Sequence, residues 1–426
     1  MSTQILNFPT AIFNNNPCEH IHRFNNWCIW CGKTLDYTPN DFQPYDNVNS
    51  HIHNPEVNSL LNQKKLYLVL DLDHTLLNTT RLTDLSLDEE YLKYRTISSL
   101  FMLDKIGIIT KLRPFVHRFL QEANKMFELC IYTLGDRAYA REMAKLLDPE
   151  DQFFKSRIIS KDDYPDRDKK GLDVLKIPEN MVMILDDTKA VWQNHKENLI
   201  LMDRYHYFSS SCRGFGYKNW KSLSQLKRDE DEYDGALATI LRVLTRIHHE
   251  FYENYKDTVD IDVRQLLKTA KQGVLRGCKI VFSGVFPRNY VAANHRLWKM
   301  AEELGALCST ELDSCVTHVV STKGDTEKSR WAVQEGKFLV HPRWIEAAYH
   351  LWRRHLEDKF PVNVATFKMK AIPSPAARLG SGVTLSTNVE LKDATRPCFH
   401  SLMGFLYTIL PEILLIALGP RMSLVT

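Results

Sequence analysis

The first half of the chain contains three short apolar runs that each end in polar residues. The run at 66–72 is rich in β-forming residues, and Asp71, Asp73 and Thr75 stand at its C-terminal end. An apolar run of this length is typical of a strand that is buried within a parallel sheet. Because side chains two positions apart lie on the same side of a strand, we expect Asp71 and Asp73 to face one ligand.

The runs at 127–132 and 181–185 predict two more buried strands. A helical pattern begins at Pro114, and Asp136 is suitably placed to cap another helix that carries an apolar face. Strands that alternate with helices indicate an α/β fold with a doubly wound parallel sheet. Ligands bind such sheets beyond the carboxyl ends of the strands, and there all three runs place polar residues.

The polar residues at these strand ends suit the transfer of a phosphoryl group. Asp71 is ionised at neutral pH and can attack phosphorus, while Asp73 can protonate the leaving alkoxide and later activate water. Thr133 follows the second strand, where its hydroxyl can donate to a phosphate oxygen or can simply form a turn. The adjacent carboxylates of Asp186 and Asp187 repel each other unless a cation lies between them. Together with Asp71 they predict a Mg²⁺ site.

A lysine near the third strand is expected to offset the charge of the phosphate. The run 166–170 contains Lys169 and Lys170, and most of its charged residues are interpreted as a solvated surface. We favour Lys170 because it is expected to open a helix that leads to the third strand. The polar segment at 78–100 is predicted to be an insertion that covers the site.

The second half of the chain repeats the alternation of strands and helices on a smaller scale. Strands are predicted at 279–284, 317–320 and 338–340, and helical patterns at 297–304, from Thr326 and from Pro342. Gly305 is expected to stop the first of these helices, and Trp344 to lie in the core of the last. Between the two halves, residues 216–268 predict a charged, mostly helical segment, which is either a connector or a helical wrap on the first half. No chemistry is indicated for it.

Composition places the chain among ordinary globular proteins. It has 426 residues, of which 44% are hydrophobic and 25% charged, which favours two or more domains. The net charge of +3 argues neither for nor against nucleic acid. The N-terminal residues lack the pattern of a secretory signal, and nine scattered cysteines suggest reduced, intracellular thiols.

The N-terminal arm holds a candidate zinc site. Its ligands would be Cys18, His20 (or His22), Cys28 and Cys31, in the order C-x-H…C-x-x-C, and the alternative is a set of unpaired thiols. At the other end, the apolar segment 402–418 is interrupted by Pro411 and Glu412 and is short for a membrane span. It is interpreted as a weak tail anchor, a helix that binds a partner, or aberrant sequence, of which we favour the last.

Residues 61–215 resemble the haloacid-dehalogenase superfamily, and within it the Fcp/Scp-type phosphatases that act on the C-terminal domain (CTD) of RNA polymerase II. The resemblance rests on the blocks at 68–77, 110–114, 132–135 and 185–187, which read LVLDLDHTLL, TKLRP, YTLG and LDD. It implies that Asp71 is the nucleophile and Asp73 the acid and base, with Thr133 and Lys170 as further catalytic residues. It also implies that Asp71, Asp73, Asp186 and Asp187 hold Mg²⁺, and that Thr75, Lys111 and Arg113 contribute to substrate binding.

Residues 270–360 resemble a BRCT domain. In members that bind phosphopeptides, a Ser/Thr-Gly turn and a helical lysine hold the phosphate, and Ser283, Gly284 and Lys328 match those positions. A hydroxyl, a backbone N–H and an ammonium together suit an anion. The alternative is a BRCT domain that binds protein without phosphate. The expected organisation is an arm at 1–60, the phosphatase domain at 61–215, the connector at 216–268, the BRCT domain at 270–360 and a tail at 361–426.

The function predicted from the sequence is therefore a Mg²⁺-dependent protein serine phosphatase. The resemblance implies that its substrate is the set of heptad repeats in the CTD, that it regulates transcription and that it lies in the nucleus. A transcription factor or another phosphoprotein is the expected partner of the BRCT domain, without direct contact to nucleic acid or membrane. The alternatives are a phosphatase of another phosphoprotein, a small-molecule phosphatase with a closing lid, a membrane-tethered phosphatase, and a scaffold whose working part is the BRCT domain.

Overall fold

The structure is a computed structural model that describes residues 23–24, 27–28, 54–164, 168–217, 220–255, 261–287 and 289–362. It divides into two units, Met1–Asn58 and Ser59–Thr426. In the first, β1 (Arg23–Phe24) pairs antiparallel with β2 (Trp27–Cys28). The candidate zinc ligands Cys18, His20 and Cys31 and the segment 402–418 lie outside the described residues, and only the backbone of Cys28 is described. The zinc site therefore stays a prediction.

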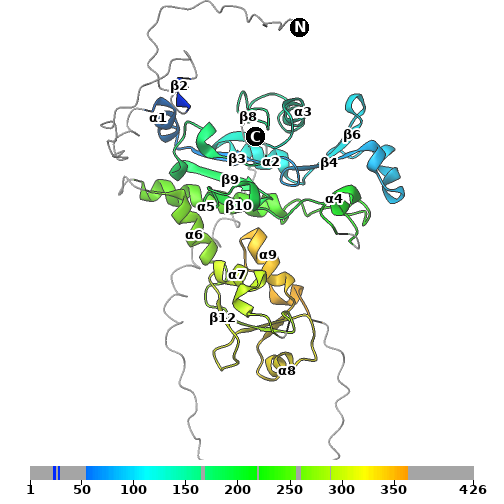
Figure 1. Ribbon diagram of the computed structural model, residues 1–426, viewed down its shortest axis with the longest axis vertical. Helices are drawn as coiled ribbons and strands as arrows, with labels where there is room; N and C mark the ends of the chain where they lie inside the picture. The colour runs from blue at the N-terminus through cyan, green and yellow to red at the C-terminus, as the bar shows by residue number, and fades with distance from the viewer. Residues whose placement is uncertain are drawn as a thin grey trace, which may run out of the picture. The chain divides into compact units, whose positions relative to one another are not determined.

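A parallel sheet forms the centre of the first half of the chain, as predicted (Figure 1). Its five strands, in the order β10-β9-β3-β7-β8, are β10 (Leu199–Leu201), β9 (Val182–Asp186), β3 (Leu66–Leu70), β7 (Phe127–Tyr132) and β8 (Ile158–Ile159). Of these, β8 and β10 were not predicted. Leu70 lies opposite Ile131 on one side and Leu185 on the other. The strands therefore end level with one another, and their following residues meet at one edge.

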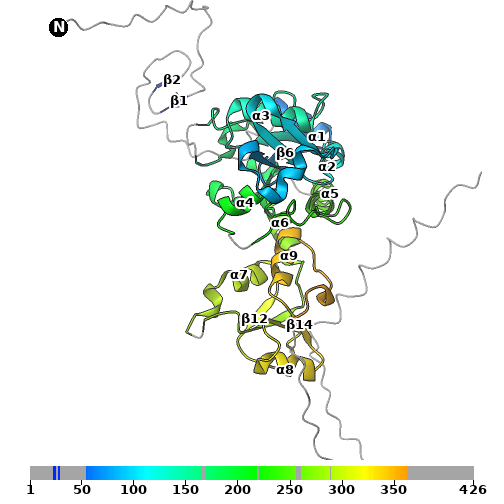
Figure 2. The ribbon, with the colours of Figure 1, turned by 90° about the vertical axis from the view of Figure 1, so that its right-hand side faces the viewer.

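The helices of this part of the chain are α1 (Pro55–Asn62), α2 (Val116–Ala123), α3 (Arg137–Leu147), α4 (Ser209–Gly214), α5 (Ala236–Asn254) and α6 (Val263–Gln272). The apolar patterns predicted α2 and α3, and the segment 216–268 was predicted to be mostly helical, whereas α1 and α4 were not predicted. Asp136 caps α3, as expected, by accepting a hydrogen bond from the Tyr139 backbone N–H. Helix α5 packs against both α2 and α6, and its contact with α2 is visible in Figure 2. The helix expected to open at Lys170 is absent, since only the 3₁₀ turn η5 (Leu172–Val174) follows.

The insertion after β3 is a small sheet, which the sequence did not indicate. It contains β4 (Leu77–Arg81), β5 (Leu100–Leu103) and β6 (Ile108–Leu112), which pair antiparallel in the order β4-β6-β5. The 3₁₀ turns η2 (Leu82–Asp84), η3 (Leu87–Lys93) and η4 (Asp104–Ile106) connect these strands. Glu89 is fully buried and accepts hydrogen bonds from the Ser209 backbone N–H and the Ser224 hydroxyl. The insertion is thereby tied to segments more than 100 residues away in the sequence.

The second half forms a four-stranded parallel sheet in the order β12-β11-β13-β14. Its strands are β11 (Lys279–Ser283), β12 (Leu307–Ser309), β13 (His318–Ser321) and β14 (Phe338–Val340), and its helices are α7 (Arg296–Glu303), α8 (Glu327–Gln334) and α9 (Arg343–Leu351). The predicted elements are confirmed and β12 is additional. Trp344 is fully buried in the core. Among the described helices, none combines the length and the apolar character needed to cross a membrane.

Candidate active site

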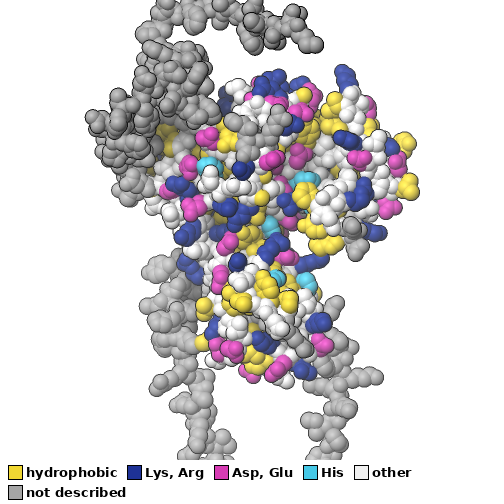
Figure 3. All heavy atoms as spheres, viewed as in Figure 1, with side chains coloured by type: hydrophobic (Ala, Val, Ile, Leu, Met, Phe, Trp, Pro, Cys, Tyr) yellow, Lys and Arg dark blue, Asp and Glu magenta, His cyan; other side chains and the backbone are white. Residues whose placement is uncertain are grey.

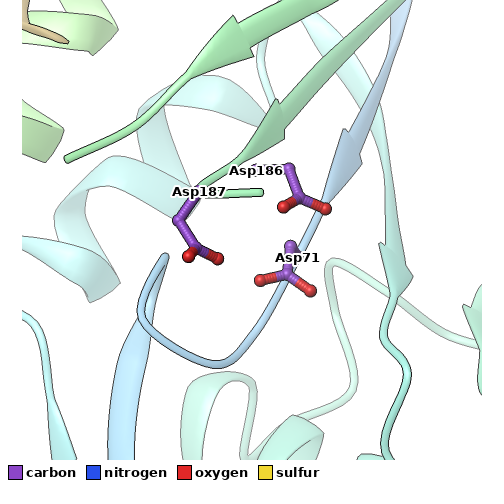
Figure 4. A group of neighbouring side chains, drawn as sticks. All are labelled: Asp71, Asp186 and Asp187. Carbon is purple, nitrogen blue, oxygen red and sulfur yellow. The ribbon is translucent and has the colours of Figure 1, made fainter. Parts of the chain in front are cut away.

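Three carboxylates meet at the carboxyl edge of the central sheet. Asp71 follows β3, Asp186 ends β9 and Asp187 comes next in the chain. One oxygen from each lies within 4.8 Å of the others, and the three groups point toward a common centre (Figure 4). All three residues are buried. The parallel register explains this meeting, because it places Leu70 directly beside Leu185.

Lys170 supplies a buried positive charge to this cluster. Its Nζ donates to Asp71 Oδ1 at 2.7 Å and to Asp186 Oδ2 at 2.6 Å, and the side chain is 2% exposed. Burial alone would lower the pKa of Lys170, but the neighbouring charges of Asp186 and Asp71 raise it above its usual value. The ammonium is therefore held charged. Its neighbour Lys169 is exposed, which agrees with the interpretation of the rest of that charged run as surface.

The electrostatics of the carboxylates fit a divalent cation. Burial raises the pKa of Asp71 well above its usual value, and the charge of Asp186 raises it further against the opposing effect of Lys170. Burial and the same neighbour also raise the pKa of Asp187. Three carboxylates are matched by two cations, because Lys170 pairs with Asp71 and Asp186 while Arg204 pairs with Asp187. The cluster is therefore short of positive charge, and oxygen ligands are those that Mg²⁺ prefers. The donor set therefore suits this ion.

Asp73 lies at the same edge with a partner that was not anticipated. The Tyr139 hydroxyl, from the first turn of α3, donates to Asp73 Oδ1 at 2.6 Å and approaches Thr79 Oγ1 at 2.9 Å. Burial raises the pKa of Asp73, and the Tyr139 hydrogen bond acts in the opposite direction. A raised pKa suits a group that must deliver a proton near neutral pH. The helical position of Tyr139, three residues after the cap Asp136, was its only signal in the sequence.

Two buried hydroxyls follow strands of the sheet that carries the carboxylates. Thr133 follows β7 and is 2% exposed, and its Oγ1 accepts a hydrogen bond from the Gly135 N–H at 3.0 Å. Thr75 is fully buried, and its Oγ1 has no hydrogen-bond partner among the described residues. A Cβ on Gly135 would lie 2.7 Å from the Tyr139 ring, so a larger residue there would displace that ring. A buried hydroxyl without a partner is compatible with a ligand that binds there.

Lys111 and Arg113 lie in ion pairs beside the sheet. Lys111 Nζ lies 2.5 Å from Asp229, and Arg113 Nη2 lies 2.7 Å from Glu230. Arg113 also donates to the Thr75 carbonyl at 3.0 Å and is almost completely buried. In this structure Arg113 links the loop after Asp71 to the connector, and Lys111 is paired with the connector alone. Their contact with a substrate stays a prediction.

Arg204 is a second residue that the sequence analysis did not single out. Its Nε donates to Asp187 Oδ2 at 2.5 Å, and its Nη2 donates to Thr188 Oγ1 at 3.1 Å. The guanidinium carbon lies 4.2 Å from the centre of the Phe215 ring. Arg204 follows β10 without a recognisable pattern, so only the folded chain brings it to Asp187.

The residues predicted to bind phosphate in the second half lie near one another without forming a closed clamp. The Ser283 hydroxyl is 2.7 Å from Thr326 Oγ1, and Gly284 has a positive φ of 63°. Lys328, on the first turn of α8, donates to the Thr310 carbonyl at 2.6 Å. The hydroxyl and the turn are thus in place, while the ammonium is held by a backbone oxygen.

Comparison with known proteins gives two matching segments and relatives that span most of the chain. Residues 66–229 match the NLI interacting factor-like phosphatase family, and residues 270–348 match the BRCA1 C Terminus (BRCT) domain. The chain is 51% identical over 369 residues to RNA polymerase II C-terminal domain phosphatase-like 4 of Arabidopsis thaliana, an alignment that covers 82% of this chain and 83% of the relative. It is 40% identical over 325 residues to RNA polymerase II C-terminal domain phosphatase-like 3 of the same plant, with 72% of this chain and 26% of that longer relative covered.

Solved structures agree with this assignment of the fold. The structure of Fcp1, described as an essential RNA polymerase II CTD phosphatase, matches 72% of this chain and 98% of its own, with 26% identity and a TM-score of 0.54. A fission yeast Fcp1 variant bound to beryllium fluoride gives a TM-score of 0.55 over the same shares.

Proposed function

Because the chain belongs to the NLI interacting factor-like phosphatases of the RNA polymerase II CTD phosphatase type, we propose that it removes phosphate from phosphoserine in the heptad repeats of that domain. The observation that carries this proposal is the meeting of Asp71, Asp186 and Asp187, of which the first two pair with Lys170. The activity of the relatives indicates the substrate, and the residues supply the chemistry of phosphomonoester hydrolysis. A nuclear location follows from that substrate.

In the first step, we assign Asp71 as the nucleophile. One of its carboxylate oxygens attacks phosphorus, and the bond from phosphorus to the seryl oxygen breaks with its electron pair on that oxygen. The Asp73 carboxyl gives its proton to the seryl oxygen, which leaves as a neutral hydroxyl. The Tyr139 hydroxyl holds Asp73 in position during this transfer.

In the second step, water replaces Asp71 on the phosphoryl group. Asp73, now a carboxylate, takes a proton from water as the water oxygen attacks phosphorus, and the Asp71 carboxylate leaves. Lys170 and the hydroxyls of Thr133 and Thr75 face the phosphoryl oxygens and offset their charge. Asp71, Asp186, Asp187 and the backbone of Asp73 would hold Mg²⁺, which when bound reduces the repulsion between the nucleophile and the phosphate.

A phosphate-release assay tests the proposal. The full chain is given singly phosphorylated serine heptad peptides, with Mg²⁺ or with a chelator, alongside the variants Asp71→Asn and Asp88→Asn. Asp88 is an exposed carboxylate of η3 and serves as the matched control. We expect Mg²⁺-dependent release that Asp71→Asn abolishes and Asp88→Asn leaves intact. Equal turnover in the wild type and in Asp71→Asn would remove Asp71 as the nucleophile.

A second function for the BRCT half is favoured by the hydroxyl pair of Ser283 and Thr326 beside the Gly284 turn. We propose that a phosphopeptide binds there and draws Lys328 from the Thr310 carbonyl. Binding of a labelled phosphopeptide to the full Asp71→Asn chain should weaken when Lys328→Ala is added, while the unphosphorylated peptide should bind weakly to both. Equal affinity in the two chains would leave the BRCT half as a protein-binding module that ignores phosphate. The predicted domain limits stay proposals as well.

A further inference from the structure

Asp187 is the carboxylate of the candidate metal site that Lys170 does not hold. The Lys170 ammonium pairs with Asp71 and Asp186, whereas Asp187 approaches the common centre from another side (Figure 4). Asp187 is paired with Arg204 instead, whose Nε lies 2.5 Å from Oδ2. The contacts of Arg204 therefore influence how this carboxylate faces the centre of the site.

Both hydrogen bonds to the Asp187 side chain end on the same oxygen. Arg204 Nε and the Thr188 hydroxyl donate to Oδ2, at 2.5 and 3.0 Å. Arg204 Nη2 donates in turn to the Thr188 hydroxyl oxygen at 3.1 Å, which closes a ring of three contacts. Within the described part of the chain, no donor is bonded to Asp187 Oδ1. A carboxylate oxygen accepts about two hydrogen bonds, so Oδ2 is used by the protein and Oδ1 is available to a ligand.

The backbone around Arg204 is held on both sides. The Met202 N–H donates to the Asp186 carbonyl at 2.9 Å, and the Tyr205 N–H donates to the His74 carbonyl at 2.8 Å. These bonds attach Arg204 to the strand that ends in Asp186 and to the loop that follows the nucleophile. The side chain therefore starts from a fixed point, as the support of a functional site requires.

The guanidinium of Arg204 is packed as well as hydrogen-bonded. Its carbon lies 4.2 Å from the centre of the Phe215 ring, and that ring packs edge-on against His74 with ring centres 5.0 Å apart. The Arg204 side chain is 28% exposed, so it can be replaced without opening the core. A planar guanidinium that stacks and donates through two nitrogens has a defined orientation, which the ammonium of a lysine does not reproduce.

We propose that Arg204 is a positioning residue, which orients Asp187 so that Oδ1 faces Mg²⁺ and thereby sets the affinity of the site for that ion. The inference rests on the proposed function, because Mg²⁺ is the ion of the proposed reaction. Loss of a partner that orients a metal ligand typically costs about 10–100-fold in metal affinity. On the face drawn in Figure 3, basic and acidic side chains are interspersed without an extended acidic area that would concentrate cations. The affinity is therefore expected to depend on how the ligands are arranged.

The opposite role for Arg204 is that of a counter-charge, which occupies Asp187 until Mg²⁺ displaces it. The contacts favour positioning, because Arg204 and Thr188 hold Oδ2 and Mg²⁺ can bind Oδ1 without breaking them. The two roles predict opposite changes when the guanidinium is removed. Loss of the positioning contacts raises the Kd for Mg²⁺, whereas loss of a competing positive charge lowers it.

Calorimetric titration of the full chain with MgCl₂, in the absence of substrate, measures this Kd. The variants are Arg204→Met, which removes the guanidinium, and Arg204→Lys, which keeps the charge. The matched control is Arg246→Met, because Arg246 also donates through Nε to a carboxylate, that of Glu250, at 2.7 Å on the surface of α5. We expect the Kd to rise about 10–100-fold in Arg204→Met, by a smaller factor in Arg204→Lys, and not at all in Arg246→Met. Partial unfolding would instead lower the number of binding sites and leave their Kd unchanged.

The outcomes separate this inference from the proposed function. An unchanged Kd in Arg204→Met would overturn the inference, and a lower Kd would identify Arg204 as a counter-charge; both results leave the phosphatase activity standing. If Arg204→Met does not fold, Phe215→Leu removes the ring beside the guanidinium and should raise the Kd about twofold to fivefold, and an unchanged value there would also overturn the inference. Absence of Mg²⁺ binding by the wild type would contradict the Mg²⁺-dependent reaction itself, and this inference with it.

Discussion

Replacement of Lys170 by methionine probes the electrostatic balance of the site most sharply. The lysine Nζ lies 2.7 Å from Asp71 and 2.6 Å from Asp186, and both carboxylates are almost completely buried. Methionine keeps much of the length and apolar volume of the side chain but leaves the two carboxylates without their shared cation. Removal of one partner from a buried ion pair typically destabilises a protein by about 3–5 kcal/mol.

The size of the effect can be expressed in melting temperature and in its response to Mg²⁺. For a domain of about 150–250 residues, a loss of about 1 kcal/mol lowers the melting temperature by about 2–4 °C. We therefore expect a decrease of about 6–20 °C in a chelating buffer. Mg²⁺ at about 100 times its Kd would raise the free energy of unfolding by about 2.7 kcal/mol, since it binds only the folded site.

Thermal unfolding of the full chain, with chelator and with Mg²⁺, measures both effects. The control is Lys145→Met, because Lys145 is 69% exposed and pairs with Glu142 on the surface of α3. Exposed pairs of this kind contribute about 0–1 kcal/mol. A decrease for Lys170→Met no larger than that of Lys145→Met would refute the view that Lys170 balances a buried anionic cluster.

Three further outcomes are expected from single residues. Tyr139→Phe should lower kcat about tenfold with little loss of stability. It should also move the alkaline limb of the kcat profile to higher pH, because the hydrogen bond that is lost had lowered the pKa of Asp73; a profile identical to the wild type contradicts this. Gly305→Ala should lower the free energy of unfolding, measured in urea, by more than about 3 kcal/mol. The reason is that φ of Gly305 is 89° and a Cβ there would lie 1.9 Å from the Gln272 carbonyl oxygen. The control Gly277→Ala, with φ of 82° and open space, should cost about 1–2 kcal/mol, and equal losses would contradict the steric argument. Burial lowers the pKa of His318 to about 4, so the unfolded chain binds the proton more tightly and stability falls as pH drops from about 6.5 to 4. Urea unfolding should show that the free energy of unfolding falls by about 2 kcal/mol between neutral pH and pH 5, and that His318→Phe removes this decrease. The same decrease in His318→Phe would assign it to other groups.

The sequence predicted the central sheet because buried parallel strands leave an unmistakable apolar pattern. The run before Asp71 became β3 with every side chain buried, and Thr133, Asp186 and Asp187 follow neighbouring strands as expected. The family resemblance is confirmed by the matches over both halves of the chain.

The elements and site residues that the sequence analysis did not predict correctly have physical explanations as well. Strand β4 reads LNTTR and has no apolar alternation, while Leu307 of β12 is 63% exposed, so neither strand stands out as buried. The helix expected after Lys170 does not form. The segment available to it lies between Gly171 and Pro178, and a proline lacks the backbone N–H that a helix continuing through it would need. Arg204 and Tyr139 reach the carboxylates only through tertiary contacts, which a single sequence does not contain.

Trapping of the covalent intermediate tests the central claim most directly. The full chain is mixed with a phosphoserine heptad peptide and Mg²⁺, quenched in acid during turnover, digested and measured by mass spectrometry. We predict a mass increase of one phosphoryl group on the peptide that contains Asp71, and its absence in Asp71→Asn. Turnover without any phosphorylated Asp71, or a phosphoryl group on another residue, would contradict the account.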